Sequence, residues 1–104
     1  MEGAFRDEGF DLDFEKHAVD VVNITSLAEA REWVERAFHQ AIETIRSKSP
    51  EEFMVQLPAG PVLGGAPRLA LISAIEEHTA HPRGALAVYS RLQGHTPPMP
   101  YGNR

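Results

Sequence analysis

The fold of this chain is decided by residues 76–94, which read EEHTAHPRGALAVYSRLQG. They sit inside the longest helical pattern of the sequence, which we place at roughly residues 67–93. Pro67 suits the first turn of that helix, where a backbone N–H has no partner within the helix. Gly94 suits the left-handed position just past its end. The stretch therefore predicts one long helix with a defined stop.

Apolar residues follow this predicted helix at steps of three and four, in two neighbouring stripes. Together the stripes make a wide buried face, as in the helices of bundles. Because the first stripe contains His78 and His81, both histidines are predicted to point where core residues point. The first stripe is Leu71, Ala74, His78, His81, Ala85, Val88 and Leu92, and the second is Ile72, Ile75, Thr79, Pro82, Leu86 and Tyr89.

A second helix is predicted over residues 27–47. Ser26 is a natural N-cap, and Glu29 stands three residues later, at the spacing of a capping box. Acidic residues come early in this helix and basic residues late, which suits the helix dipole. Its predicted inner stripe is Leu27, Ala30, Val34, Ala37, Phe38, Ala41 and Ile45.

A short helical turn and a loop are predicted to join the two helices. Ser49 can cap the turn, with Pro50 at its first position. Prolines and glycines in residues 58–67 predict the loop. The apolar side chains expected to close the end of a bundle here are those of Phe53, Met54 and Leu57.

Residues 1–24 form an N-terminal arm in this interpretation, within a single helical domain of residues 1–104. Valines and an isoleucine at its end (Val19, Val21, Val22, Ile24) predict a short extended segment. We expect the arm to pack on something, including a second copy of the chain. The alternative is a partly ordered leader.

The end of the chain resembles a known family. The residues that carry the resemblance are His78-x-x-His81-x-Arg83-Gly84-x-Leu86-x-x-Tyr89-x-Arg91-Leu92-x-Gly94 and Pro97-Pro98-x-x-Tyr101-Gly102, which are similar to the last helix and tail of DinB-like proteins. The resemblance implies a four-helix bundle, in a family whose members are about one and a half times this length. Many members carry a divalent metal, nickel or zinc for example, on three histidines. One comes from the second helix and two from the last, at i and i+4, the second directly before Arg-Gly.

His78 matches the first of those last-helix positions, whereas the second falls on Pro82. The second-helix histidine has no counterpart in this chain. His78 and His81 remain our candidate metal ligands, because residues at i and i+3 share one side of a helix. The alternative is that His78 is a neutral core or interface histidine bonded to a carboxylate or carbonyl group.

Arg83 and Gly84 also belong to the shared pattern. A glycine inside an exposed helix costs about 1 kcal/mol relative to alanine. Its presence predicts close approach by another helix or chain segment. Arg83 is expected to bond tail carbonyls or an acid on a neighbouring helix. The proline-rich tail is expected to fold back on the bundle, and the alternative is a polyproline ligand for another protein.

Two long helices leave much of a wide apolar face uncovered. A homodimer that completes a four-helix bundle would cover it. The predicted fold is therefore all-α, with two long helices of a DinB-like bundle completed by a second copy.

Composition narrows the range of functions. The net charge is −5, and residues 1–24 alone hold seven acids and two bases. Without a basic patch, nucleic-acid binding is not expected. No run of 18 apolar residues is present, so we expect no membrane span. The acidic start predicts no signal peptide, and the absence of cysteine fits a cytoplasmic protein.

Two functions are compatible with these observations. In the first, the chain is a non-catalytic or degenerate assembly and binding domain, because two of the three implied metal ligands have no counterpart. In the second, which the resemblance implies, it is a divalent-metal-dependent enzyme of thiol-transferase or hydrolase type. No catalytic residue is predicted for either.

Overall fold

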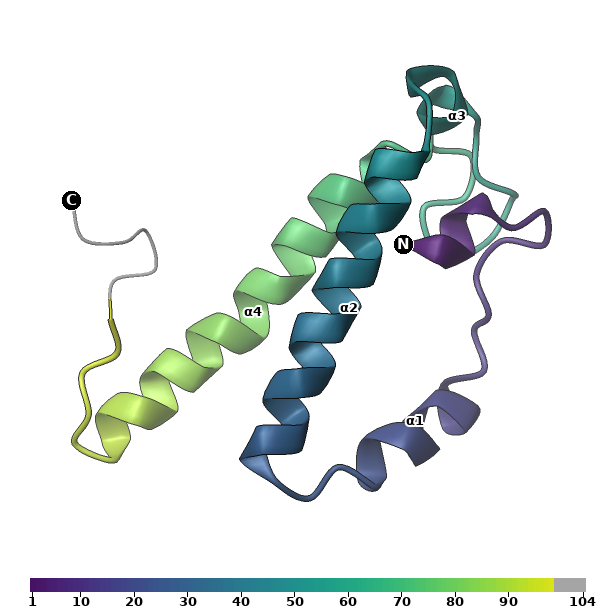
Figure 1. Ribbon diagram of the computed structural model, residues 1–104. Helices are drawn as coiled ribbons and strands as arrows, with labels where there is room; N and C mark the ends of the chain where they lie inside the picture. Colours follow the sequence, from purple (N-terminus) through teal and green to yellow (C-terminus); the bar gives the residue numbers. More distant parts are fainter. Residues whose placement is uncertain (99–104) are drawn as a thin grey trace. The chain divides into compact units, whose positions relative to one another are not determined.

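A computed structural model describes residues 1–98 of the chain, and their fold is all-α (Figure 1). A 3-10 helix, η1 (Glu2–Phe5), precedes four α-helices, and the described residues form no strand. The chain divides into two compact units, Met1–Leu71 and a second that begins at Ile72. The α-helices are α1 (Phe14–Val22), α2 (Leu27–Ser47), α3 (Pro50–Met54) and α4 (Ala70–Leu92).

The start of α2 confirms the predicted capping box. Ser26 Oγ accepts a hydrogen bond from the backbone N–H of Glu29 at 3.2 Å. The Glu29 carboxylate in turn accepts from the Ser26 backbone N–H at 3.1 Å and from its hydroxyl at 2.8 Å. These bonds, led by that from the Ser26 hydroxyl, lower the pKa of Glu29. Two otherwise unpaired N–H groups are thus satisfied, which fixes where the helix begins.

The predicted cap of α3 is also confirmed. Ser49 is its N-cap and Pro50 opens the helix. The Glu52 carboxylate accepts from the Ser49 backbone N–H at 2.9 Å and from Lys48 Nζ at 3.3 Å. The bond from the Ser49 N–H is the largest cause of the lowered pKa of Glu52. The hydrogen bonds of its first turn therefore fix where this five-residue helix begins.

The buried apolar centre of the first unit lies around α3. Phe53 is 8 % exposed and Leu57 is 3 % exposed, and the ring of Phe53 meets the ring of Phe5 edge to face at 5.4 Å. Met54, predicted to be buried with them, is 63 % exposed, so that prediction is wrong. Successive helical residues are rotated by about 100°, so in a helix of one turn Met54 points away from the face that Phe53 buries.

The junction between α3 and α4 is a loop, as predicted, but α4 begins later than predicted. Pro67 forms an isolated antiparallel bridge with Gln56 instead of opening the helix. The next two N–H groups, of Arg68 and Leu69, donate to the carbonyls of Val55 and Phe53, each at 3.0 Å. Because residues 66–69 pair antiparallel with residues 53–57, helical geometry starts only at Ala70.

The extended segment predicted near residue 20 is wrong. Residues Phe14–Val22 form α1, capped by Asp13, whose carboxylate accepts from the Lys16 backbone N–H at 3.0 Å. Valine is a poorer helix former than alanine, but an N-cap hydrogen bond offsets about 1 kcal/mol of that cost. Phe14 and Val22 stay exposed.

In the second unit, α4 continues through Pro82 and ends as predicted. Gly94 is left-handed, with φ of +80°. Its N–H donates to the Arg91 carbonyl at 2.9 Å, and the His95 N–H donates to the Ser90 carbonyl at 3.0 Å. These two bonds make a Schellman motif. The predicted return of the tail beyond Pro98, including Tyr101 and Gly102, lies outside the described residues.

Candidate functional site

The two histidines predicted as metal ligands, His78 and His81, lie in α4 and are both exposed. A separation of three residues places them about 4.5 Å apart along the helix axis and on the same side. Within residues 1–98, no three His, Cys, Asp or Glu side chains converge as a metal site would require. Binding of nickel or zinc by His78 and His81 stays a prediction.

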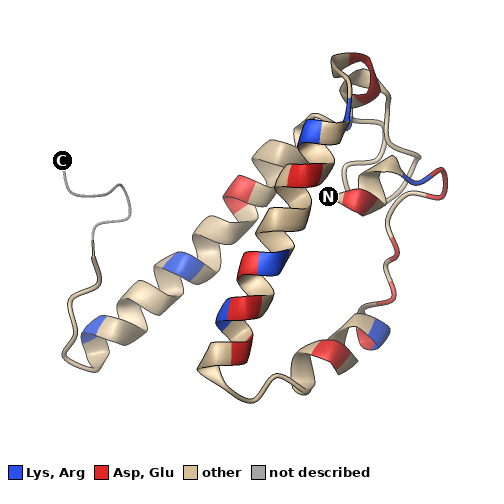
Figure 2. Ribbon diagram, viewed as in Figure 1, with Lys and Arg blue, Asp and Glu red and all other residues tan. Residues whose placement is uncertain are grey.

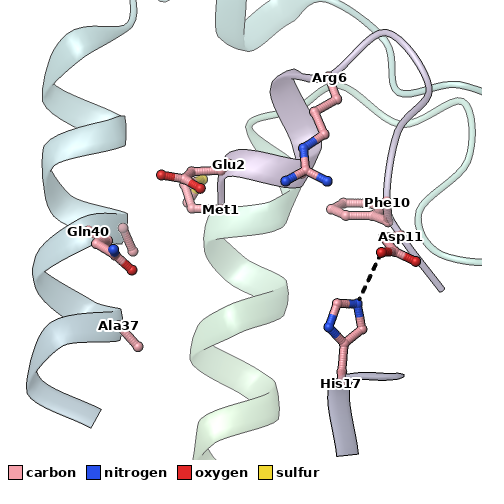
Figure 3. A pocket seen from close by; sticks show the side chains of 10 residues that line it. Met1, Glu2, Arg6, Phe10, Asp11, His17, Ala37 and Gln40 are labelled. Atoms are coloured by element: carbon pink, nitrogen blue, oxygen red, sulfur yellow. Dashed lines mark ion pairs between the residues drawn. The ribbon is translucent and has the colours of Figure 1, made fainter. Parts of the chain in front are cut away.

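A pocket in the first unit brings several polar side chains together (Figure 3). Its volume is about 350 Å³. Side chains from the N-terminal segment and from α1 line it together with one side of α2. We call it the N-terminal pocket, and its lining is Met1, Glu2, Gly3, Arg6, Phe10, Asp11, His17, Ala37, Gln40 and Ala41.

Asp11 is the best-connected acid in the N-terminal pocket. Its carboxylate accepts from the Asp13 backbone N–H at 3.0 Å and from Lys16 Nζ at 3.1 Å, and it lies 3.5 Å from His17 Nε2 (Figure 3). The Asp13 N–H, followed by Lys16, lowers the pKa of Asp11. Asp11 is thus a stable carboxylate that ties the chain before α1 to the first turns of that helix.

The Asp11–His17 contact is longer than a direct hydrogen bond between acid–base partners. Such partners lie within about 2.6–3.2 Å of each other, whereas His17 Nε2 lies 3.5 Å from the Asp11 carboxylate. Asp11 is also committed to Lys16 and to the backbone. With Arg6 and Gln40 nearby, the pocket can hold water or a small polar molecule. The pair itself acts as a brace for α1.

The sequence did not predict this cluster, because residues 1–24 were interpreted as an arm and no helix was predicted around His17. A usable signal was present: aspartate is a common N-cap, and Asp13 directly precedes Phe14. Its carboxylate can accept from the backbone N–H three residues later, which is that of Lys16. A helix from residue 14 places Lys16 and His17 in its first turn. Their meeting with Asp11 depends on the turn of the chain before the helix.

We found no match for the chain among protein-family models, curated proteins or solved structures. No helix in residues 1–98 combines the length and the apolarity needed to cross a membrane.

Proposed function

We propose that this protein is an assembly domain that associates with a second copy of itself. The observation that carries the proposal is the shortage of buried apolar side chains. Within residues 1–98, the buried hydrophobic residues are Ala4, Phe53, Leu57 and Leu71. A soluble chain of this length normally buries a continuous core, and large exposed apolar patches mark interaction surfaces.

The predicted inner stripe of α2 illustrates the shortage. Leu27 is 69 % exposed, Val34 is 56 % exposed and Phe38 is 47 % exposed. Fully burying a side chain of this size stabilises a protein by about 1.5–3 kcal/mol. Association that covers this stripe would therefore supply several kcal/mol. The same is true of α1, where Phe14 and Val22 are exposed.

A second copy is the occupant we favour. Two copies of α2 and two of α4 supply the four long helices of a bundle. This architecture is also the one that the DinB-like resemblance implies, with the present chain corresponding to the C-terminal half of such a protein. The absence of cysteine supports a cytoplasmic location for the assembly.

The alternative proposal is a divalent-metal-dependent enzyme of thiol-transferase or hydrolase type. It is favoured by the exposure of His78 and His81 on one side of α4, where a partner could add ligands. Against it, Pro82 stands where the resemblance implies a ligand, and a proline side chain has no donor atom. We therefore place assembly first.

The test is the mass of the purified protein by light scattering, with metal content measured on the same sample. Assembly predicts a particle of twice the chain mass of 11.5 kDa, without stoichiometric metal. A well-folded monomer at micromolar concentration would refute self-assembly. Stoichiometric nickel or zinc that is lost in His78→Ala would instead support the enzyme.

A further inference from the structure

One face of α4 combines small residues with a single charge at each end. We call it the Gly84 face. Its residues recur at steps of three or four, so they lie on one side of the helix. Val88 is 53 % exposed, and the other residues of the face are exposed too, except Ala87, which is half-buried. The face consists of Glu77, Ala80, Gly84, Ala87, Val88 and Arg91.

Gly84 lies at the middle of this face, and no described part of the chain requires a glycine there. A Cβ added to Gly84 would meet no atom within 4 Å, and Gly84 is not among the glycines with positive φ. A glycine in a helix interior lowers stability by about 1 kcal/mol relative to alanine. What a glycine does permit is close approach by another backbone.

The charges on the Gly84 face are placed symmetrically about that glycine. Glu77 precedes it by seven residues and Arg91 follows it by seven. Seven residues span about 10.5 Å along the axis and return to within about 20° of the same direction. A twofold axis through Gly84 would place Glu77 of one copy opposite Arg91 of the other. Each dimer would then contain two such Glu77–Arg91 contacts. Neither side chain forms an ion pair with another described residue.

A cavity borders this face. Its volume is about 600 Å³, and its lining is Ala80, Arg83, Gly84, Leu86, Ala87, Arg91, Pro97 and Pro98. From His78 to Pro98 the chain has two arginines and no acidic residue (Figure 2). A parallel partner would therefore bring like charges together. An antiparallel partner brings Glu77 to Arg91.

We infer that α4 pairs with α4 of a second copy, antiparallel and in contact through the Gly84 face. Small residues at the centre let the two backbones approach closely, and the two Glu77–Arg91 pairs fix direction and register. This inference rests on the proposed self-assembly and specifies the contact that makes it.

Charge reversal tests the predicted register. In Glu77→Arg the new cation faces Arg91 of the partner, and in Arg91→Glu the new acid faces Glu77. We expect each single variant to raise the dimer Kd at least about tenfold, because like charges then meet twice. The double variant Glu77→Arg/Arg91→Glu restores opposite charges, and we expect its Kd to return to within about threefold of the wild type. A double variant as weak as the two singles would overturn the inference.

Cross-linking tests the position of the twofold axis. The chain has no cysteine, so one introduced thiol can bond only to its copy. Gly84→Cys places two thiols beside the axis, within the reach of a disulfide. Tyr89→Cys is the matched control, since Tyr89 lies about 140° around α4 from Gly84, does not line the cavity and is 63 % exposed. Under mild oxidation we expect Gly84→Cys to form covalent dimers far faster than Tyr89→Cys. Equal rates, or a faster control, would rule out contact through this face.

The two proposals fail in different ways. A monomeric wild type refutes self-assembly and this contact together. A dimeric wild type whose Kd is unchanged by both single charge reversals leaves self-assembly standing and refutes the Gly84 contact alone.

Discussion

The buried centre around α3 gives the sharpest stability prediction, because neighbouring residues there differ in burial. Phe53 is 8 % exposed and contacts the Phe5 ring edge to face, with interplanar angle 87°. Lys48 Nζ and the Arg68 guanidinium lie 5.0 and 5.1 Å from the centre of the Phe5 ring. Phe53→Ala removes the ring that packs against Phe5, and Phe5 is the ring over which both cations lie.

The expected cost follows from the burial of each side chain. Truncating a buried phenylalanine to alanine costs about 3–5 kcal/mol. Met54 is 63 % exposed, so roughly a third of its side chain is buried and Met54→Ala should cost about 0.5–1 kcal/mol. The two substitutions should thus differ by about 2–4 kcal/mol, a large part of the stability of a small domain.

The assay is urea unfolding followed by far-UV circular dichroism, with both variants and the wild type at one protein concentration. Concentration must be fixed because association adds to apparent stability. With a slope of about 1 kcal/mol per molar urea, Phe53→Ala should lower the midpoint by about 2–4 M more than Met54→Ala. Equal midpoints for the two variants would refute the reasoning that α3 buries one face only.

Three further predictions concern the local signals that start and stop helices. Ser26→Ala removes the hydroxyl that accepts from Glu29 N–H and should lower the free energy of unfolding by about 1 kcal/mol, measured by urea unfolding. The pKa of Glu29 is lowered by folding, so its stabilising contribution is complete above its ordinary value of 4.5 and is lost as pH falls through the lower folded value. Helicity should therefore fall on acidification, and less so in Glu29→Gln, as measured by circular dichroism between pH 7 and pH about 2. Gly94→Ala forces a Cβ into a left-handed position and should cost about 1 kcal/mol in thermal unfolding, whereas Gly60→Ala, at a glycine without positive φ, should change stability by less than about 0.5 kcal/mol. An equal effect of Gly94→Ala and Gly60→Ala would show that the end of α4 is not held by its glycine.

For the candidate metal ligands, the sequence predicted the helix but not the surroundings. Apolar periodicity places His78 and His81 within one long helix, and the structure places both in α4, but both are exposed and do not point into a core as predicted. Their surroundings do not follow from periodicity, because a metal site needs side chains from more than one element. The Asp11–His17 contact was missed for the same reason, since it depends on how the chain turns before α1.

What the sequence determined by itself is local. Ser26 with Glu29, Ser49 with Pro50, and Gly94 each fix a helix end through hydrogen bonds or backbone angles that involve only a few neighbouring residues. Such interactions form wherever the segment becomes helical, so residue types and spacing are enough to predict them.

Only the tertiary structure decided which backbone groups bond to distant segments of the chain and which side chains those segments bury. The helix α4 starts at Ala70 and not at the predicted Pro67 because residues 66–69 pair antiparallel with residues 53–57, a long-range pairing that no local pattern encodes. The burial of Phe53 beside an exposed Met54 likewise depends on where the Phe5 ring lies. Periodicity states which residues can share a face, whereas packing and hydrogen-bond competition between distant segments select the face that is buried.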